Sequence, residues 1–284
     1  MMKSKKVIFM LATLLVLLVI FQVLVLGVAT PKGYQLIYSW IFFAINYLII
    51  ILLCMIYTKN SFLKWSKWLI GLILFVANTT FFFYMGDVNL VVSKSQDQNE
   101  VILKEFNKMN TETVHLKRRG IIFGRETGSL MGSSSYKAIE EETYKIDWVS
   151  EDVAIVTYKV SEQGNLQQEF ISRRSSTYSS YQYVAVGLMG RWYQKDNSDN
   201  YVQFDQGEIV YAKEGQLYYY TYEDTVQHGI FSIVVNGDDN KPSFSIVINA
   251  DASYDEDGLI KKGGTITVSP ITLDNIDGNI YERK

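Results

Sequence analysis

The stretch "GQLYYYTYE", residues 215–223, reads as one β-strand that carries four tyrosines in five positions. Successive side chains of a strand point to opposite faces. The stretch therefore has one face made only of tyrosines, which are Tyr218, Tyr220 and Tyr222. The opposite face is mixed and contains Leu217, Tyr219 and Thr221. Which face meets the core decides whether the tyrosines pack the fold or contact another molecule.

The strand is one of several in the last third of the chain. Residues 183–284 contain eight short candidate strands, separated by turn signals such as "KDNSD", "DQG", "KEG" and "NGDDNKP". Short strands at this spacing are typical of an all-β barrel or sandwich. We therefore expect residues 183–284 to form an antiparallel meander, closed as a small barrel or a sandwich.

The segment before it is also rich in β-structure. In "ETYKIDWV", residues 142–149, large and polar side chains alternate with the period of two that a half-buried strand shows. "VAIVTYKV" and "LQQEFIS" follow after turns. We expect residues 101–182 to form a first β-rich unit, and the polar residues 87–100 to be a linker.

One short motif in the last third of the chain resembles the motif of a known family. Gly190-Arg191-Trp192 lies in the first strand of the expected meander, and it resembles the Gly-x-Trp entry of lipocalin-like domains. That resemblance, which covers about the last hundred residues, implies a structural role for three residues. Trp192 would close one end of the barrel, Gly190 would precede it, and Arg283 would pack over it.

Charge divides the chain sharply. Residues 1–86 contain seven Lys and no Asp, Glu or Arg, whereas the rest contains 20 Lys and Arg against 30 Asp and Glu, a net charge of −10. This asymmetry indicates a membrane anchor followed by an acidic outer part. Nucleic acid is not an expected partner, because its binding depends on clustered basic residues that neutralise phosphates.

Three apolar stretches in residues 1–86 predict three transmembrane helices: 7–28, 36–56 and 68–85. We favour an uncleaved first helix over a signal peptide, because its apolar run is long and two more follow. Lysines are the residues that orient such helices, and they cluster before the first stretch and after the second, at Lys3, Lys5, Lys6, Lys59, Lys64 and Lys67. The positive-inside rule then predicts a multi-pass protein with a cytoplasmic N-terminus and an extracytoplasmic C-terminal part.

Only one cysteine, Cys54, is present, so the chain cannot form an internal disulfide. An outer domain without cysteine fits the cell envelope of a Gram-positive bacterium. Within that domain we expect the all-tyrosine face to point outward, because three hydroxyls are hard to satisfy in a small interior. Tyrosines on neighbouring strands would extend this expected binding surface: Tyr193, Tyr201 and Tyr211.

Several motifs suggest chemistry, but each has a simpler interpretation. Ser134 and Lys137 have the Ser-x-x-Lys spacing of penicillin-recognising serine enzymes, yet no helix is expected there. The acidic turn at Asp255 and Asp257 lacks the acidic twelfth residue of a calcium loop, and its calcium binding stays open. His115 and His228 have no ligand spacing, so we expect no metal and no cofactor. The basic runs 117–119 and 173–174 are either solvated strand edges or contacts for an anionic wall polymer.

These features together predict a membrane-anchored, non-enzymatic protein that binds or senses a ligand, a protein or a wall component outside the cell. The alternative is a cell-envelope hydrolase or transferase whose site the sequence does not reveal.

Overall fold

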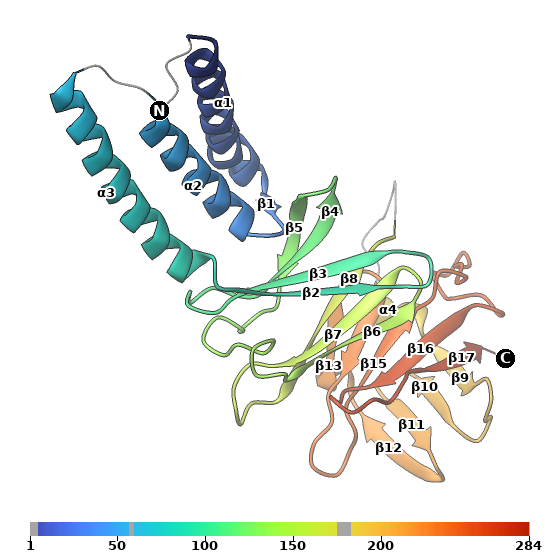
Figure 1. Ribbon diagram of the computed structural model, residues 1–284. Coiled ribbons are helices and arrows are strands. Elements are labelled where there is room, and N and C mark those ends of the chain that lie inside the picture. Colours follow the sequence, from blue (N-terminus) through green and yellow to red (C-terminus); the bar gives the residue numbers. More distant parts are fainter. Residues whose placement is uncertain (1–4, 57–59, 175–182, 284) are drawn as a thin grey trace. The chain divides into compact units, whose positions relative to one another are not determined.

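A computed structural model describes residues 5–56, 60–174 and 183–283 (Figure 1). Lys3, Lys59 and the expected domain boundary at residue 182 lie outside these ranges. The chain forms two compact units. We call residues 1–92 with 100–141 the helical unit, and residues 93–99 with 142–284 the barrel unit. The expected first β-rich unit, residues 101–182, is thus divided between the two.

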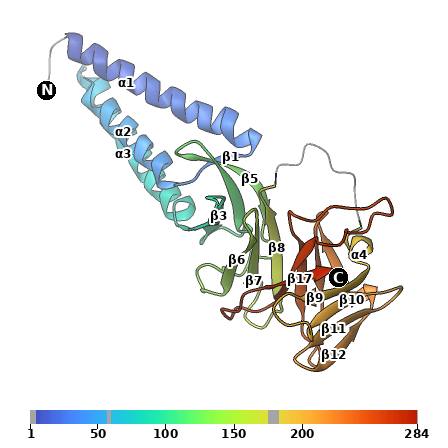
Figure 2. The same ribbon diagram turned by 90° about the vertical axis from the view of Figure 1, so that its right-hand side faces the viewer.

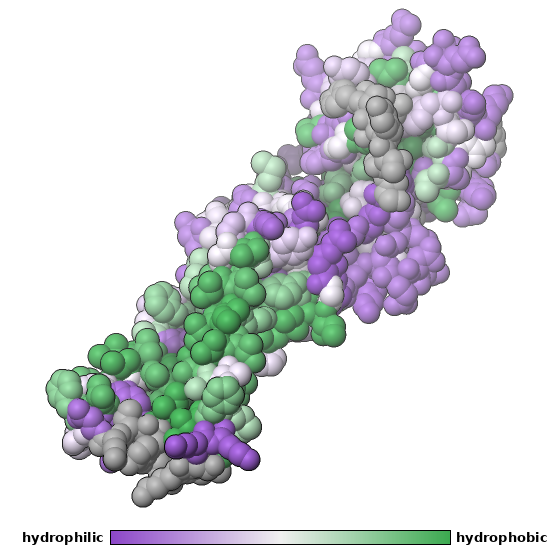
Figure 3. Space-filling model, turned by 90° about the horizontal axis from the view of Figure 1, so that it is seen from above, coloured by the Kyte–Doolittle hydropathy of each residue, from purple (hydrophilic) through white to green (hydrophobic). Residues whose placement is uncertain are grey.

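Three helices open the helical unit. α1 (Lys5–Leu24) continues through a π-helical turn, η1 (Val25–Ala29), and a 3₁₀ turn, η2 (Thr30–Lys32), and α2 (Trp40–Met55) and α3 (Ser61–Met85) follow. Two helical segments, Lys5–Lys32 and Ser61–Met85, are long and apolar enough to cross a membrane. Most of their large apolar side chains are exposed, and Figure 3 shows hydrophobic surface gathered on this part of the protein.

The second helix is shorter than expected, at 16 residues. The apolar stretch was predicted to start at Leu36, but Tyr34–Leu36 forms strand β1 and pairs with β5. Gly33 makes this exit from the helix possible, because its φ of 74° lies in the left-handed region that glycine adopts at little cost. The third helix is longer than expected, since it begins at Ser61.

A five-stranded sheet completes the helical unit, in the order β1-β5-β4-β3-β2. Its core contains Ile37, Ile102 and Leu116. The expected linker, residues 87–100, is instead mostly sheet and turn. Polar residues 93–100 suggested a linker, but polarity marks a tight turn equally well, and here a turn at 95–99 joins two strands. The four strands after β1 are β2 (Val88–Lys94), β3 (Glu100–Phe106), β4 (Val114–Arg119) and β5 (Phe123–Ser129).

The barrel unit contains two sheets (Figure 2). The smaller one has three antiparallel strands where the sequence predicted them: β6 (Tyr144–Ser150), β7 (Val153–Lys159) and β8 (Leu166–Ser172). Val153 and Ile155 of β7 pack against Val247 of the larger sheet. The smaller sheet therefore covers part of the outside of the larger one.

The larger sheet has nine strands, all paired antiparallel, in the order β12-β11-β10-β9-β17-β16-β15-β14-β13. These strands are β9 (Gly190–Gln194), β10 (Tyr201–Phe204), β11 (Ile209–Lys213), β12 (Gln216–Tyr220), β13 (Thr225–His228), β14 (Ser232–Val235), β15 (Phe244–Ile248), β16 (Thr265–Pro270) and β17 (Asn279–Arg283). A helical turn, α4 (Val184–Gly187), precedes β9 where the sequence predicted the start of a strand.

The connection between β12 and β13 requires this sheet to curl. A flat sheet of nine strands would hold its two edges about 38 Å apart. Residues 221–224, which join the two edge strands, let the chain span at most about 18 Å. The sheet is therefore a half-barrel, and we use that name for it below. After eight antiparallel steps β12 and β13 run in the same direction, as the two halves of one bent strand do.

Candidate functional site

The interior of the half-barrel is packed with aromatic and aliphatic side chains. Tyr220 is 1% exposed and Tyr211 is 7% exposed, and Tyr218 and Tyr222 pack against the same core. Leu217 and Tyr219, on the opposite face of β12, are about half exposed. The prediction that the all-tyrosine face points outward is therefore wrong.

The hydroxyl groups explain how the tyrosines can point inward. Tyr220 donates to the Pro242 carbonyl at 2.6 Å, and Tyr222, in the 3₁₀ turn η3 (Tyr222–Asp224), donates to the Asp205 carbonyl at 2.8 Å. Burial raises the pKa of Tyr220 above its usual value, so this hydroxyl stays protonated and can donate. Both acceptors come from loops far away in the sequence. Because they satisfy the buried hydroxyls, burying Tyr220 and Tyr222 does not carry the cost of an unpaired hydroxyl, which was the reason to expect the tyrosine face to point outward.

Trp192 belongs to this core. Its side chain is 0% exposed, and its indole Nε1 donates to the Leu188 carbonyl at 2.7 Å. Arg283 of β17 stands directly opposite Trp192 in the sheet register. Gly190 has a φ of 110°, and a Cβ atom there would lie 3.3 Å from the Arg283 guanidinium. The three residues of the lipocalin-like resemblance are thus neighbours at one end of the sheet.

An open groove of about 360 Å³ lies beside these residues. We call it the Gly190 groove, and it is lined by Met189, Gly190, Arg191, Gln203, Phe204, Asp205, Gln206, Leu259 and Arg283. Arg283 donates to the Ile260 carbonyl, which fixes its side chain against the neighbouring loop. The groove therefore combines two guanidinium groups with one carboxylate.

The outer face of β9 and β10 continues from the groove. The guanidinium of Arg191 lies 4.5 Å from the centre of the Tyr201 ring and donates to Gln203 Oε1 at 2.8 Å. The rings of Tyr193 and Tyr201 are 6.2 Å apart. Of the six tyrosines predicted to bind a partner, Tyr193 and Tyr201 are thus on the outer face, and the other four are in or against the core. Arg191 and Gln203 were missed as candidates, although Arg191 is the middle residue of the Gly-x-Trp motif.

Ser134 and Lys137 do not lie on a helix, where the Ser-x-x-Lys motif of serine enzymes is placed. Lys137 Nζ donates to the Thr111 carbonyl at 2.9 Å, and residues 131–136 form turns and bends rather than a helix. A Ser-x-x-Lys nucleophile would require the lysine to accept a proton from Ser134.

The remaining candidates have structural roles. The Asp255 carboxylate accepts from the backbone of Asp257 and Leu259, closing the acidic turn. His228 packs 5.0 Å from the Phe170 ring, and burial lowers its pKa. His115 is buried beside Thr127, 2.8 Å from its hydroxyl. Across residues 5–56, 60–174 and 183–283, no three His, Cys, Asp or Glu side chains are grouped as a metal site would need.

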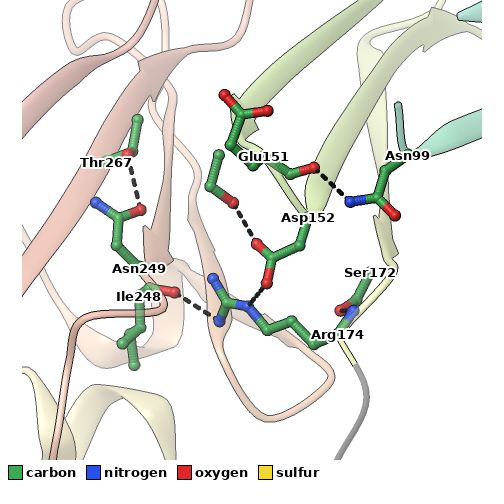
Figure 4. A network of polar contacts seen from close by, with 9 residues as sticks. Asn99, Glu151, Asp152, Ser172, Arg174, Ile248, Asn249 and Thr267 are labelled. Atoms are coloured by element: carbon green, nitrogen blue, oxygen red, sulfur yellow. Dashed lines mark hydrogen bonds and ion pairs between the residues drawn. The ribbon is translucent and has the colours of Figure 1, made fainter. Parts of the chain in front are cut away.

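Both basic runs contribute an arginine to an ion pair. Arg118 is 2.6 Å from Glu100, and Arg174 is 2.9 Å from Asp152. Figure 4 shows that Arg174 also reaches the Ile248 carbonyl of the half-barrel, at 2.8 Å. Arg174 thus ties the small sheet to the half-barrel.

Comparison of the whole chain with protein-family models, with curated proteins and with solved structures finds no match.

Proposed function

We propose that this chain is a membrane-anchored binding or sensing protein, without enzymatic activity, whose half-barrel faces the outside of the cell. Three helices anchor it, with the N-terminus in the cytoplasm. The half-barrel acts as a small lipocalin-like domain whose core is filled, so that its ligand or envelope partner contacts the surface.

The Gly190 groove with its adjoining outer face is the observation that carries this proposal. Arg191 is exposed and held by Gln203 and Tyr201, so little side-chain freedom is lost when it meets a partner. Tyrosine and arginine are enriched at protein interfaces, and arginine suits carboxylate and phosphate groups. An anionic group of an envelope partner therefore fits this surface.

The topology can be tested by cysteine labelling in a Cys54→Ala background. Ser198 and Ser61 are both exposed and belong to different expected sides. Ser198→Cys should react with a membrane-impermeant maleimide in intact cells, whereas Ser61→Cys should react only after permeabilisation. The reverse pattern would refute the orientation.

Binding can be tested with the full chain in detergent micelles and isolated Gram-positive cell walls, with and without their anionic phosphate polymers. Arg191→Gln should weaken co-sedimentation about tenfold, as expected for loss of one charged hydrogen bond. Lys195→Gln removes the same charge from an exposed position outside the groove and should change binding less than about twofold. Equal effects of both changes would mean that only net charge matters, and would contradict a site at Arg191.

A further inference from the structure

The helical unit contains a cavity at the end of the helices that carries the sheet. It has a volume of about 500 Å³, within the range of sites that bury small ligands. Its wall combines residues of η1, η2, α2 and α3 with Leu36 of β1 and Phe106 of β3. We call it the amide cavity, because Asn46 and Asn78 line it.

Most of the wall is apolar, and part of it opens on the helix surface. Leu26 and Phe81 line the cavity, yet they are 59% and 60% exposed. If the helices cross a membrane, as proposed above, the molecules that meet these two side chains are lipids. Lipid chains therefore have direct access to the cavity.

Polar groups lie at two places around it. Thr30, Gln35 and Ser39 line the part next to the sheet. Asn46 and Asn78, further along α2 and α3, are joined by a hydrogen bond of 2.9 Å. The cavity thus presents one set of polar groups next to the sheet and the Asn46–Asn78 pair deeper between the helices, and its apolar lining includes Phe42 and Phe81. The polar set next to the sheet suits a lipid headgroup, and the apolar side chains suit an acyl chain.

Two local features of the helices around the cavity are unusual for residues that serve only to pack the helices together. Gln22 donates to Asn46 and to the Phe42 carbonyl, but its own buried Oε1 accepts no hydrogen bond within the described residues. Val25 and Leu26, which line the cavity, belong to the π-helical turn η1. Such turns are rare and occur frequently at functional sites.

A buried cation lies behind the same wall. Lys104 is 3% exposed, donates to the Leu36 carbonyl at 2.8 Å, and lies 4.9 Å from the Phe106 ring. It forms no ion pair with any residue that the structure describes. Burial lowers the pKa of Lys104 to about 8, with partial compensation from Glu126. An ammonium group has three donors, and one is used here, so an anion nearby would be favourable.

We infer that the amide cavity binds one anionic membrane phospholipid, with an acyl chain along Phe42 and Phe81 and its phosphate at the polar end of the cavity, on the other side of the Leu36 wall from Lys104. This inference rests on the membrane placement proposed above and not on binding at the Gly190 groove. Labelling at Ser198 and Ser61 tests the placement, so a failure of one proposal can be told from a failure of the other.

The test uses the full chain purified in detergent and incubated with equal amounts of phosphatidylglycerol and phosphatidylcholine. Native mass spectrometry should detect about one retained phosphatidylglycerol per chain. Ser39→Trp should fill the cavity and reduce retention at least about fivefold, since Ser39 makes no capping hydrogen bond that the change would remove. Leu48→Trp adds a tryptophan to an exposed position of α2 outside the cavity and should retain lipid like the unchanged chain.

Lys104→Met should keep lipid retention but reduce the preference for phosphatidylglycerol about fivefold, as expected for one lysine at an anionic headgroup. Unchanged retention in Ser39→Trp would overturn the inference. A photoreactive benzoylphenylalanine at Phe42 provides a second measurement, in case Ser39→Trp does not fold. Crosslinking to phospholipid supports the inference, and crosslinking to another polypeptide overturns it in favour of a helix-binding cavity.

Discussion

Trp192→Ala is expected to reduce the free energy of unfolding of the barrel unit by about 3–5 kcal/mol, the usual range for an emptied aromatic core site. The side chain is completely buried, so its removal leaves a cavity. The change also removes the indole donor of the Leu188 carbonyl, and a buried acceptor without a donor is costly. Denaturant unfolding of the full chain in micelles, followed by near-ultraviolet circular dichroism, measures the loss.

Trp65→Ala is a matched control for this change. Trp65 lies in the first part of α3 and is 76% exposed, so the same substitution should cost less than about 1 kcal/mol. A loss of that small size at Trp192 would contradict its place in the buried core. Such a result would also contradict the role that the lipocalin-like resemblance implies for Trp192.

The strands of the barrel unit were predictable because most of them bury one face. In β10, for example, Val202 and Phe204 are buried and alternate with two partly exposed residues. Such alternation reports on one strand at a time, and turn residues separate one strand from the next. Every one of the eight expected strands is present at its position, although helix α4 replaces the first residues of one, and β12 ends at Tyr220, where the 3₁₀ turn η3 replaces the last residues of the expected strand.

Strand β13 and strand β1 were not predictable in the same way. β13 follows a 3₁₀ turn in which Thr221 and Asp224 cap each other, and its sequence, "TVQH", has no apolar alternation. β1 ends at Leu36, where the apolar run that becomes α2 has already begun. In both cases the partner strand, and not the local sequence, decides the structure.

The candidate site was only partly predictable for a related reason. The Gly-x-Trp motif located Gly190 and Trp192, and the resemblance paired them with Arg283. The groove beside them, however, depends on which residues of β10 stand opposite β9, such as Gln203 opposite Arg191. Periodicity gives the face of a residue within its strand but not its cross-strand neighbour.

Tyr220 and Tyr219 offer the sharpest test of the inward face, because they are adjacent and chemically identical. Tyr220→Ser should destabilise the barrel unit by about 3–4 kcal/mol, since it empties a core position. It also removes ring contacts with Phe244, 5.5 Å away, and the hydrogen bond to the Pro242 carbonyl. Tyr220→Phe should cost only about 1 kcal/mol, because it loses the hydrogen bond alone.

Tyr219→Ser is the matched control, since this side chain is 52% exposed on the opposite face of β12. Surface substitutions usually change stability by less than about 0.5 kcal/mol, and the same is expected here. Guanidinium unfolding of the three variants side by side would measure the differences. If Tyr219→Ser were the destabilising change, the alternation along β12 would be reversed. The tyrosine face would then point outward, as the sequence alone suggested, and it would again be available for a partner.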